Sequence, residues 1–229
     1  MKTIGLIGGM SAESTVPYYR IINAEVGRRL GGLHSARIVL YSVDFHEVEA
    51  MQSAGRWDEA GDMLAGCALA LQRAGADFLV LCTNTMHKVA PAIEAASRLP
   101  LLHVADATAE AVLRQGSTRV GLLGTRFTME HDFLRERLRQ RGVETLVPAA
   151  PEREIVHRVI YDELCRGDVR EASRAQYVRI IAGLAQAGAQ AVVLGCTEIG
   201  LLVRPQDAPL ALFDTASIHA LAAAEFALQ

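Results

Sequence analysis

The segments Val80-Leu81-Cys82-Thr83-Asn84-Thr85 and Val193-Leu194-Gly195-Cys196-Thr197-Glu198 resemble each other, although they lie in different halves of the chain. The stretches before them also match, as Ala74-Gly75-Ala76-Asp77 and Ala187-Gly188-Ala189-Gln190. In each case a short apolar run ends at a cysteine followed by a threonine and a polar residue. Such a run predicts a buried strand. Two cysteines in the same local context indicate a pair that acts on one substrate.

The repeat extends beyond the cysteines. Residues 118–125 resemble residues 2–8, and residues 209–215 resemble residues 100–106. Strands that alternate with helices predict parallel sheets covered on both faces. We therefore predict an α/β protein with two similar doubly wound parallel-sheet domains, related by a pseudo-twofold axis. Expected strands lie at 2–7, 37–43, 78–81, 101–104, 144–147 and 191–194, and expected helices at 11–30, 58–74, 86–97, 129–141, 152–165 and 171–186.

The duplication also predicts the domain boundaries. The first domain is expected to comprise residues 1–98 and 208–229 and to carry Cys82, and the second to comprise residues 99–207 and to carry Cys196. The polar stretch 44–55 is long for a connection in a compact domain, which predicts a lid or a substrate loop.

In parallel α/β sheets, ligands bind beyond the carboxyl ends of the strands. Four polar motifs are predicted to fall at such ends. The sequence therefore predicts an active site in a cleft between the domains, lined by residues 8–11, 82–85, 125–128 and 196–198.

The composition excludes several classes of protein. The chain has 229 residues, of which 51% are hydrophobic, and a formal net charge of −3, which does not indicate nucleic-acid binding. No apolar run approaches the ~20 residues that span a bilayer, and the glycine-rich start is not typical of a signal peptide. Four cysteines without CxxC spacing indicate neither a zinc site nor a disulfide framework. We expect a cytoplasmic protein with reduced thiols, no metal and a small-molecule substrate.

The four cysteines are not equivalent. Cys67, within an alanine-rich helix, is interpreted as a core residue. Cys165 is interpreted in the same way, with a position at the border of the cleft as the alternative. Cys82 and Cys196 stand just past a strand and before an expected helix start, where a helix dipole can lower a thiol pKa from ~8.5 towards neutrality.

Two such thiols suit a two-base reaction at a carbon acid. One thiolate removes a proton from one face while the other thiol returns a proton to the opposite face, which inverts the stereocentre. The neighbouring polar groups can bind a substrate carboxylate and its developing enolate charge, with helix capping as the alternative role. These groups are the side chains and backbone N–H groups of Thr83, Asn84, Thr85 and Thr197.

Three motifs together resemble the aspartate/glutamate racemase family. They are Ile7-Gly8-Gly9-Met10-Ser11, Cys82-Thr83-Asn84-Thr85-Met86-His87 and Gly195-Cys196-Thr197-Glu198, and the resemblance covers essentially the whole chain. The resemblance implies an amino-acid racemase that needs neither pyridoxal phosphate nor any other cofactor. It also implies two similar α/β domains, a C-terminal segment that returns to the first domain, and a homodimer.

Carried over by residue, the resemblance makes Cys82 and Cys196 the acid/base thiols. It places seven further residues on substrate-contacting loops: Met10, Thr83, Asn84, Thr85, Thr125, Thr197 and Glu198. Glu198 has three open roles, namely binding the substrate ammonium, tuning Cys196 or capping a helix.

The predicted substrate pocket departs from the pattern for acidic substrates. Members that act on acidic substrates often carry an arginine near residue 48 and a basic residue near 164–166. Here residues 47–52 contain no basic residue, although Arg166 is a candidate for the second position. The loop resembles broad-specificity members that accept neutral side chains such as homoserine, which Gln52 could hydrogen-bond.

Several alternatives remain open from the sequence. Maleate isomerases and arylmalonate decarboxylases share this superfamily, and the second class needs only one cysteine. A protein that binds an amino acid without chemistry is a further alternative, but it leaves the paired thiols unexplained. A Cys–His hydrolase is disfavoured because nothing around Cys82 and His87 resembles a protease motif.

Overall fold

Each half of the chain forms a four-stranded parallel sheet, and the two sheets share one strand order. The computed structural model describes all 229 residues. The first sheet has the order β2-β1-β3-β4 and the second has the equivalent order β6-β5-β7-β8. All neighbouring strands run parallel. The prediction of two similar α/β halves with parallel sheets is confirmed.

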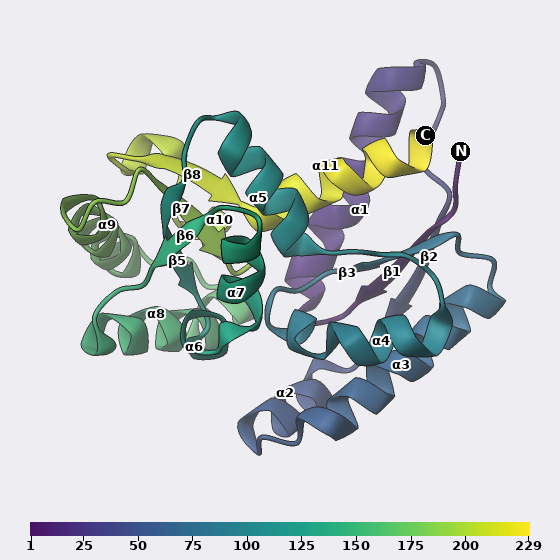
Figure 1. Cartoon of the computed structure of the whole chain (residues 1–229), viewed down its shortest axis with the longest axis horizontal. Helices are drawn as coiled ribbons and strands as arrows, with labels where there is room; N and C mark the ends of the chain where they lie inside the picture. The colour runs from purple at the N-terminus through teal and green to yellow at the C-terminus, as the bar shows by residue number, and fades with distance from the viewer. The chain divides into compact units, whose positions relative to one another are not determined.

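The first unit comprises Met1–His103 and His219–Gln229. Its core lies on both faces of the sheet. Helix α3 packs on one face against Ile7, Leu79 and Leu81. On the other face, the rings of Phe78 and Phe226 are 4.8 Å apart and bring α11 against the sheet (Figure 1). The elements are β1 (Ile4–Gly8), α1 (Ala12–Leu30), β2 (Ile38–Ser42), α2 (Phe45–Ser53), α3 (Trp57–Arg73), β3 (Phe78–Leu81), the 3₁₀ helix η1 (Thr85–Val89), α4 (Ala90–Ser97), β4 (Leu101–Leu102) and most of α11 (Thr215–Leu228).

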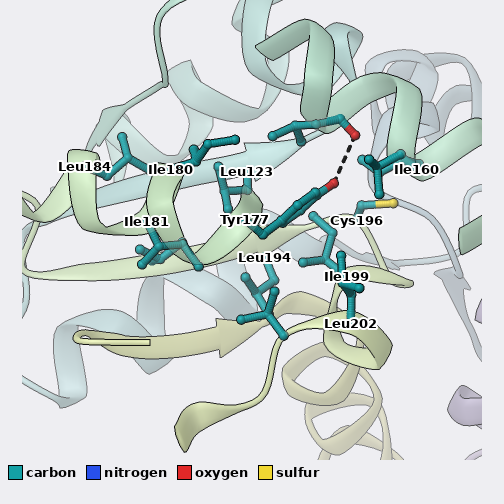
Figure 2. Close-up of a cluster of buried hydrophobic side chains, with 14 of the residues drawn as sticks. Leu123, Ile160, Tyr177, Ile180, Ile181, Leu184, Leu194, Cys196, Ile199 and Leu202 are labelled. Atoms are coloured by element: carbon teal, nitrogen blue, oxygen red, sulfur yellow. Dashed lines mark hydrogen bonds between the residues drawn. The ribbon is translucent and has the colours of Figure 1, made fainter. Parts of the chain in front are cut away.

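The second unit comprises Val104–Ile218. Helices α8 and α9 cover one face of its sheet and α5 and α7 the other, each through its own apolar cluster. Figure 2 shows the first cluster around Tyr177, whose hydroxyl donates a hydrogen bond to the carbonyl of Val156 at 2.9 Å. The elements are α5 (Val104–Arg114), β5 (Arg119–Gly124), α6 (Arg126–Glu130), α7 (Asp132–Gln140), β6 (Glu144–Leu146), α8 (Ala150–Asp162), the 3₁₀ helix η2 (Leu164–Arg166), α9 (Glu171–Gln186), β7 (Ala191–Gly195), α10 (Ile199–Leu202), the 3₁₀ helix η3 (Pro205–Asp207) and β8 (Ala211–Asp214).

The central strands are apolar throughout because helices cover both faces of each sheet. Every residue of β1, β3 and β7 is buried, whereas the edge strand β2 leaves Leu40 and Tyr41 exposed. No helix in the structure combines the length and the hydropathy needed to cross a bilayer.

The chain crosses between the two units five residues later than expected at the first boundary and eleven residues later at the second. The chain passes between units at 103/104 and 218/219, against the expected 98/99 and 207/208. Strand β4 pairs with β3 in the first sheet, and β8 pairs with β7 in the second. Each pairing therefore keeps its strand with the sheet that precedes it.

The stretch 44–55 is not the long irregular loop that its polarity suggested. Residues Phe45–Ser53 form helix α2, which begins where the Asp44 carboxylate accepts a hydrogen bond from the backbone N–H of His46 at 2.9 Å. Helix α2 buries Val48, Met51 and Gln52 against the unit. The absence of secondary structure expected here was wrong, because the Asp44 cap and the burial of three side chains stabilise a short helix. The role of this segment as a lid or a substrate loop stays a prediction.

Three buried histidines meet in the first unit. The rings of His87 and His103 are 4.4 Å apart, and those of His87 and His219 are 5.8 Å apart. Nε2 of His219 donates to the carbonyl of Leu102 at 2.8 Å, so Nδ1 accepts from the hydroxyl of Tyr18 at 2.9 Å. His219 is therefore held as a neutral imidazole, and burial lowers its pKa to about 4.

We expect His219 to make the protein sensitive to acid. Its neutral form is favoured only in the folded state, so its stabilising contribution is complete above pH ~6.5 and is lost as the pH falls towards 4. The shift corresponds to about 3 kcal/mol of unfolding free energy. Urea unfolding at pH 7 and pH 4 should show a smaller pH-dependent loss for His219→Gln than for the natural protein. The exposed-site control His34→Gln should keep the full loss, and an equal loss in all three proteins would contradict this assignment.

Candidate active site

Cys82 lies at the carboxyl end of β3, opposite the glycine turn that follows β1. Its backbone N–H donates to the carbonyl of Ile7 at 2.9 Å, and its own carbonyl accepts from the hydroxyl of Ser14 at 3.4 Å. The thiol is fully buried, and Sγ lies 4.0 Å from the carbonyl of Val80. The strand pairing places Cys82 next to the end of β1, where the Gly8–Ser11 segment begins.

The turn after β1 depends on glycine. Gly9 has a φ of 92°, and a Cβ atom there would lie 2.3 Å from the carbonyl oxygen of Val43. Its backbone N–H donates to the hydroxyl of Thr15 at 2.8 Å. A side chain at this position would clash with the backbone of Val43, just after β2, so the close approach of the two segments requires glycine.

The predicted substrate residues of the first unit are all buried. Gln52 reaches the segment after Cys82, where its side-chain amide contacts Sδ of Met86 at 2.9 Å. His87 holds the same segment, since its Nδ1 donates to the carbonyl of Thr83 at 2.8 Å. The buried residues are Met10, Gln52, Thr83, Asn84 and Thr85. The structure thus brings Gln52 to the Cys82 segment.

Cys196 holds the matching place in the second unit, directly after β7. Because Gly124 pairs with Gly195, Thr125 and Cys196 both follow neighbouring strand ends. Thr125 caps α6, with its hydroxyl accepting from the backbone N–H of Thr128 at 3.2 Å. Figure 2 shows Cys196 beside the ring of Tyr177 and the side chain of Ile199.

The carboxylate of Glu198 contacts Cys196. The Cys196 thiol and the Thr197 hydroxyl both donate to Oε2, at 3.0 Å and 2.6 Å. The thiol of Cys165, from η2, lies 3.8 Å from Oε1. Arg166, the next residue, is exposed. Sequence reasoning treated Cys165 as a core residue, and its place at the end of a helix before Arg166-Gly167 was the only signal of its contact with Glu198.

Both thiols are protonated in the free protein, in contrast to the lowered pKa expected from the sequence. Burial alone raises the pKa of Cys82 well above its usual range. Burial and then the charge of Glu198 raise the pKa of Cys196. The segment after Cys82 begins as a short 3₁₀ helix, and the element after Cys196 is a four-residue helix. The cost of burying a thiolate outweighs the dipoles of such short helices.

We expect Cys82 and Cys196 to react slowly with iodoacetamide when no ligand is present. At pH 7.5 the rate at each should fall below that of free cysteine, because the thiolate is the reacting species and burial disfavours it. Peptide mapping by mass spectrometry measures each site separately. Alkylation of either site faster than free cysteine would contradict the raised pKa.

The fold and the paired cysteine motifs define a duplicated α/β protein of the racemase type. Residues 7–223 match the family described as Asp/Glu/Hydantoin racemase. The chain belongs to that family, as the sequence motifs predicted.

Two solved structures are similar over their full length. A candidate Asp/Glu racemase from Yersinia pestis is 56% identical with a TM-score of 0.93, and an aspartate racemase homologue from Pyrococcus horikoshii is 34% identical with a TM-score of 0.85. Each comparison covers 100% of both chains.

A curated glutamate racemase from Aquifex aeolicus is similar over a shorter region. It is 28% identical over 142 residues, which are 60% of this chain and 52% of that protein. The chain therefore spans about half the length of this curated relative.

Proposed function

We propose that this chain is a cofactor-independent amino-acid racemase in which Cys82 and Cys196 exchange protons with the α-carbon of one substrate. Membership of the Asp/Glu/Hydantoin racemase family supports an amino-acid racemase. The observation that carries the two-thiol mechanism is the equivalence of the cysteines. Each follows the third strand in the order of its sheet, β3 in one unit and β7 in the other.

The proposed reaction uses one thiolate and one thiol. The thiolate takes the α-proton, and the electron pair of the C–H bond passes into the substrate carboxylate as an enolate. The opposite thiol then gives its proton to the other face of the α-carbon. Hydroxyl and backbone N–H groups next to the cysteines stabilise the enolate charge. We assign this role to Thr83, Asn84, Thr85 and Thr197, with Met10 and Thr125 lining the substrate.

We propose a substrate range that includes neutral polar amino acids, with homoserine as the representative. Helix α2 carries two glutamates and no lysine or arginine. The next basic residue, Arg56, is paired with Glu59 at 2.9 Å. A distal carboxylate would therefore find little positive charge on α2, whereas the Gln52 amide can bind a hydroxyl. Arg166 is the remaining cation for an acidic substrate.

We further propose that the protein works in the cytoplasm as a homodimer. A reducing medium keeps both thiols free, and all four cysteines are free in the structure. Sedimentation of the purified protein tests the dimer.

Replacing either proposed acid/base thiol should abolish racemisation. Cys82→Ser and Cys196→Ser should each lower kcat by roughly 10²- to 10⁴-fold, because a serine hydroxyl is a far weaker acid/base at neutral pH. The control Cys67→Ser, in the core of the first unit, should stay within a few-fold of the natural protein. Full activity in either of the first two variants would overturn the two-base mechanism.

We expect α-deuterium incorporation and D-product when L-homoserine is incubated in deuterated water without a cofactor, followed by NMR and chiral chromatography. Aspartate and glutamate complete the panel. Gln52→Leu should raise KM for homoserine by roughly 5-fold through the lost hydrogen bond, whereas the exposed control Gln72→Leu should not. No exchange with any amino acid would overturn the proposal, and turnover of maleate in the same assay would favour the isomerase alternative.

A further inference from the structure

Glu198 is a buried carboxylate whose two oxygens are both engaged within its own unit. The side chain is 3% exposed. Oε2 accepts from Cys196 and Thr197, and Oε1 faces the thiol of Cys165. A carboxylate held in this way faces the proposed acid/base thiol directly. This favours tuning of Cys196 over the two other open roles, ammonium binding and helix capping.

The first unit has no such group in the corresponding place. Cys82-Thr83-Asn84 aligns with Cys196-Thr197-Glu198 in the repeat, so an amide stands where the second unit has a carboxylate. Sγ of Cys82 lies near a backbone carbonyl. The two thiols therefore occupy equivalent positions in their units, but only Cys196 has a carboxylate beside it that can accept a proton.

Cys165 comes from a different element than the pair it contacts. It lies in η2, after α8, and is partly buried against the apolar cluster that contains Cys196. The S–H···Oε1 contact at 3.8 Å is a weak one, but it fixes the second oxygen of the carboxylate. The other oxygen is thereby left directed at Cys196.

We propose that Glu198 accepts the thiol proton of Cys196 when that thiol is to act as the base, and that Cys165 is a positioning residue that holds the Glu198 carboxylate. This inference rests on the proposed function. It assigns the negative charge needed for catalysis to the Cys196–Glu198 pair, whose members are in direct contact.

The protons balance over one turnover. The S–H bond of Cys196 breaks, its electron pair stays on sulfur, and an O–H bond forms on Glu198. The thiolate then takes the α-proton, and Cys82 gives its proton to the opposite face. The enzyme is left with a Cys82 thiolate and a protonated Glu198, and transfer of one proton between them through water restores the starting form.

Glu198→Gln tests the proton acceptor by its pH profile. At pH 7 we expect kcat to fall roughly 10- to 100-fold, since an amide cannot take the proton. The loss of kcat should become smaller as the pH rises, because Cys196 can then give its proton to water. KM should change little. A pH profile parallel to that of the natural protein would overturn the assignment, as would a loss confined to KM, which indicates ammonium binding.

A double-mutant cycle tests Cys165. Cys165→Ala should lower kcat roughly 3- to 10-fold, in line with loss of a weak hydrogen bond to a charged group. The same change should cost almost nothing in the Glu198→Gln background if Cys165 acts through Glu198. Additive losses would overturn the positioning role, as would natural activity in Cys165→Ala. Cys67→Ala serves as the buried-thiol control.

A measurement without substrate separates this inference from the proposed function. If Glu198 takes the thiol proton of Cys196, Glu198→Gln should lower iodoacetamide alkylation of Cys196 at pH 7.5, because the thiolate is the reacting species and an amide cannot take the proton. Alkylation of Cys82 should not change. If the natural protein racemises nothing but this selective decrease is seen, the racemase proposal fails while the acceptor role of Glu198 stands. Unchanged or faster alkylation of Cys196 would overturn the acceptor role.

Discussion

Parallel pairing of the central strands is the constraint on which both thiols depend. Ile7 pairs with Leu81, so Cys82, the first residue after β3, lies near the turn at Gly9. In the same way, Gly124 pairs with Gly195, so Cys196 lies near Thr125. Neighbouring parallel strands end at the same edge of a sheet. The residues directly after a strand are therefore held at a defined place on that edge.

Burial then decides the charge that these positions can carry. The strands that deliver the cysteines are covered on both faces, so the thiols end in surroundings that disfavour a thiolate. The same packing that fixes Cys82 and Cys196 therefore keeps them protonated. The proposed two-base reaction needs one thiolate, and hence a group that accepts the displaced proton. The carboxylate of Glu198, 3.0 Å from Sγ of Cys196, is the acceptor that we propose.

Much of the fold could be predicted because short sequence patterns indicate its strands and its duplication. The buried strands appear as continuous apolar runs, and the duplication places Cys82 and Cys196 in equivalent segments. Helix α2 was missed because its inward residues, Val48, Met51 and Gln52, do not stand out in a polar stretch. The contact of Cys165 with Glu198 was missed for a different reason: it joins residues 33 positions apart, and only tertiary packing brings them together. The pKa direction was also missed, because a dipole can be inferred from a motif but full burial cannot.

The difference between Asn84 and Glu198 bears on how one carboxylate can serve both directions of a racemisation. In the proposed mechanism, abstraction by Cys196 leaves Cys82 as thiolate and the spare proton on Glu198. That form is already prepared for abstraction by Cys82 on the opposite enantiomer, after which Cys196 gives up its proton and recovers one from Glu198. A second carboxylate beside Cys82 would add another buried negative charge, which is costly in an apolar interior. A single proton store next to one thiol is therefore sufficient for both directions, and an amide at the matching position in the first unit avoids that cost.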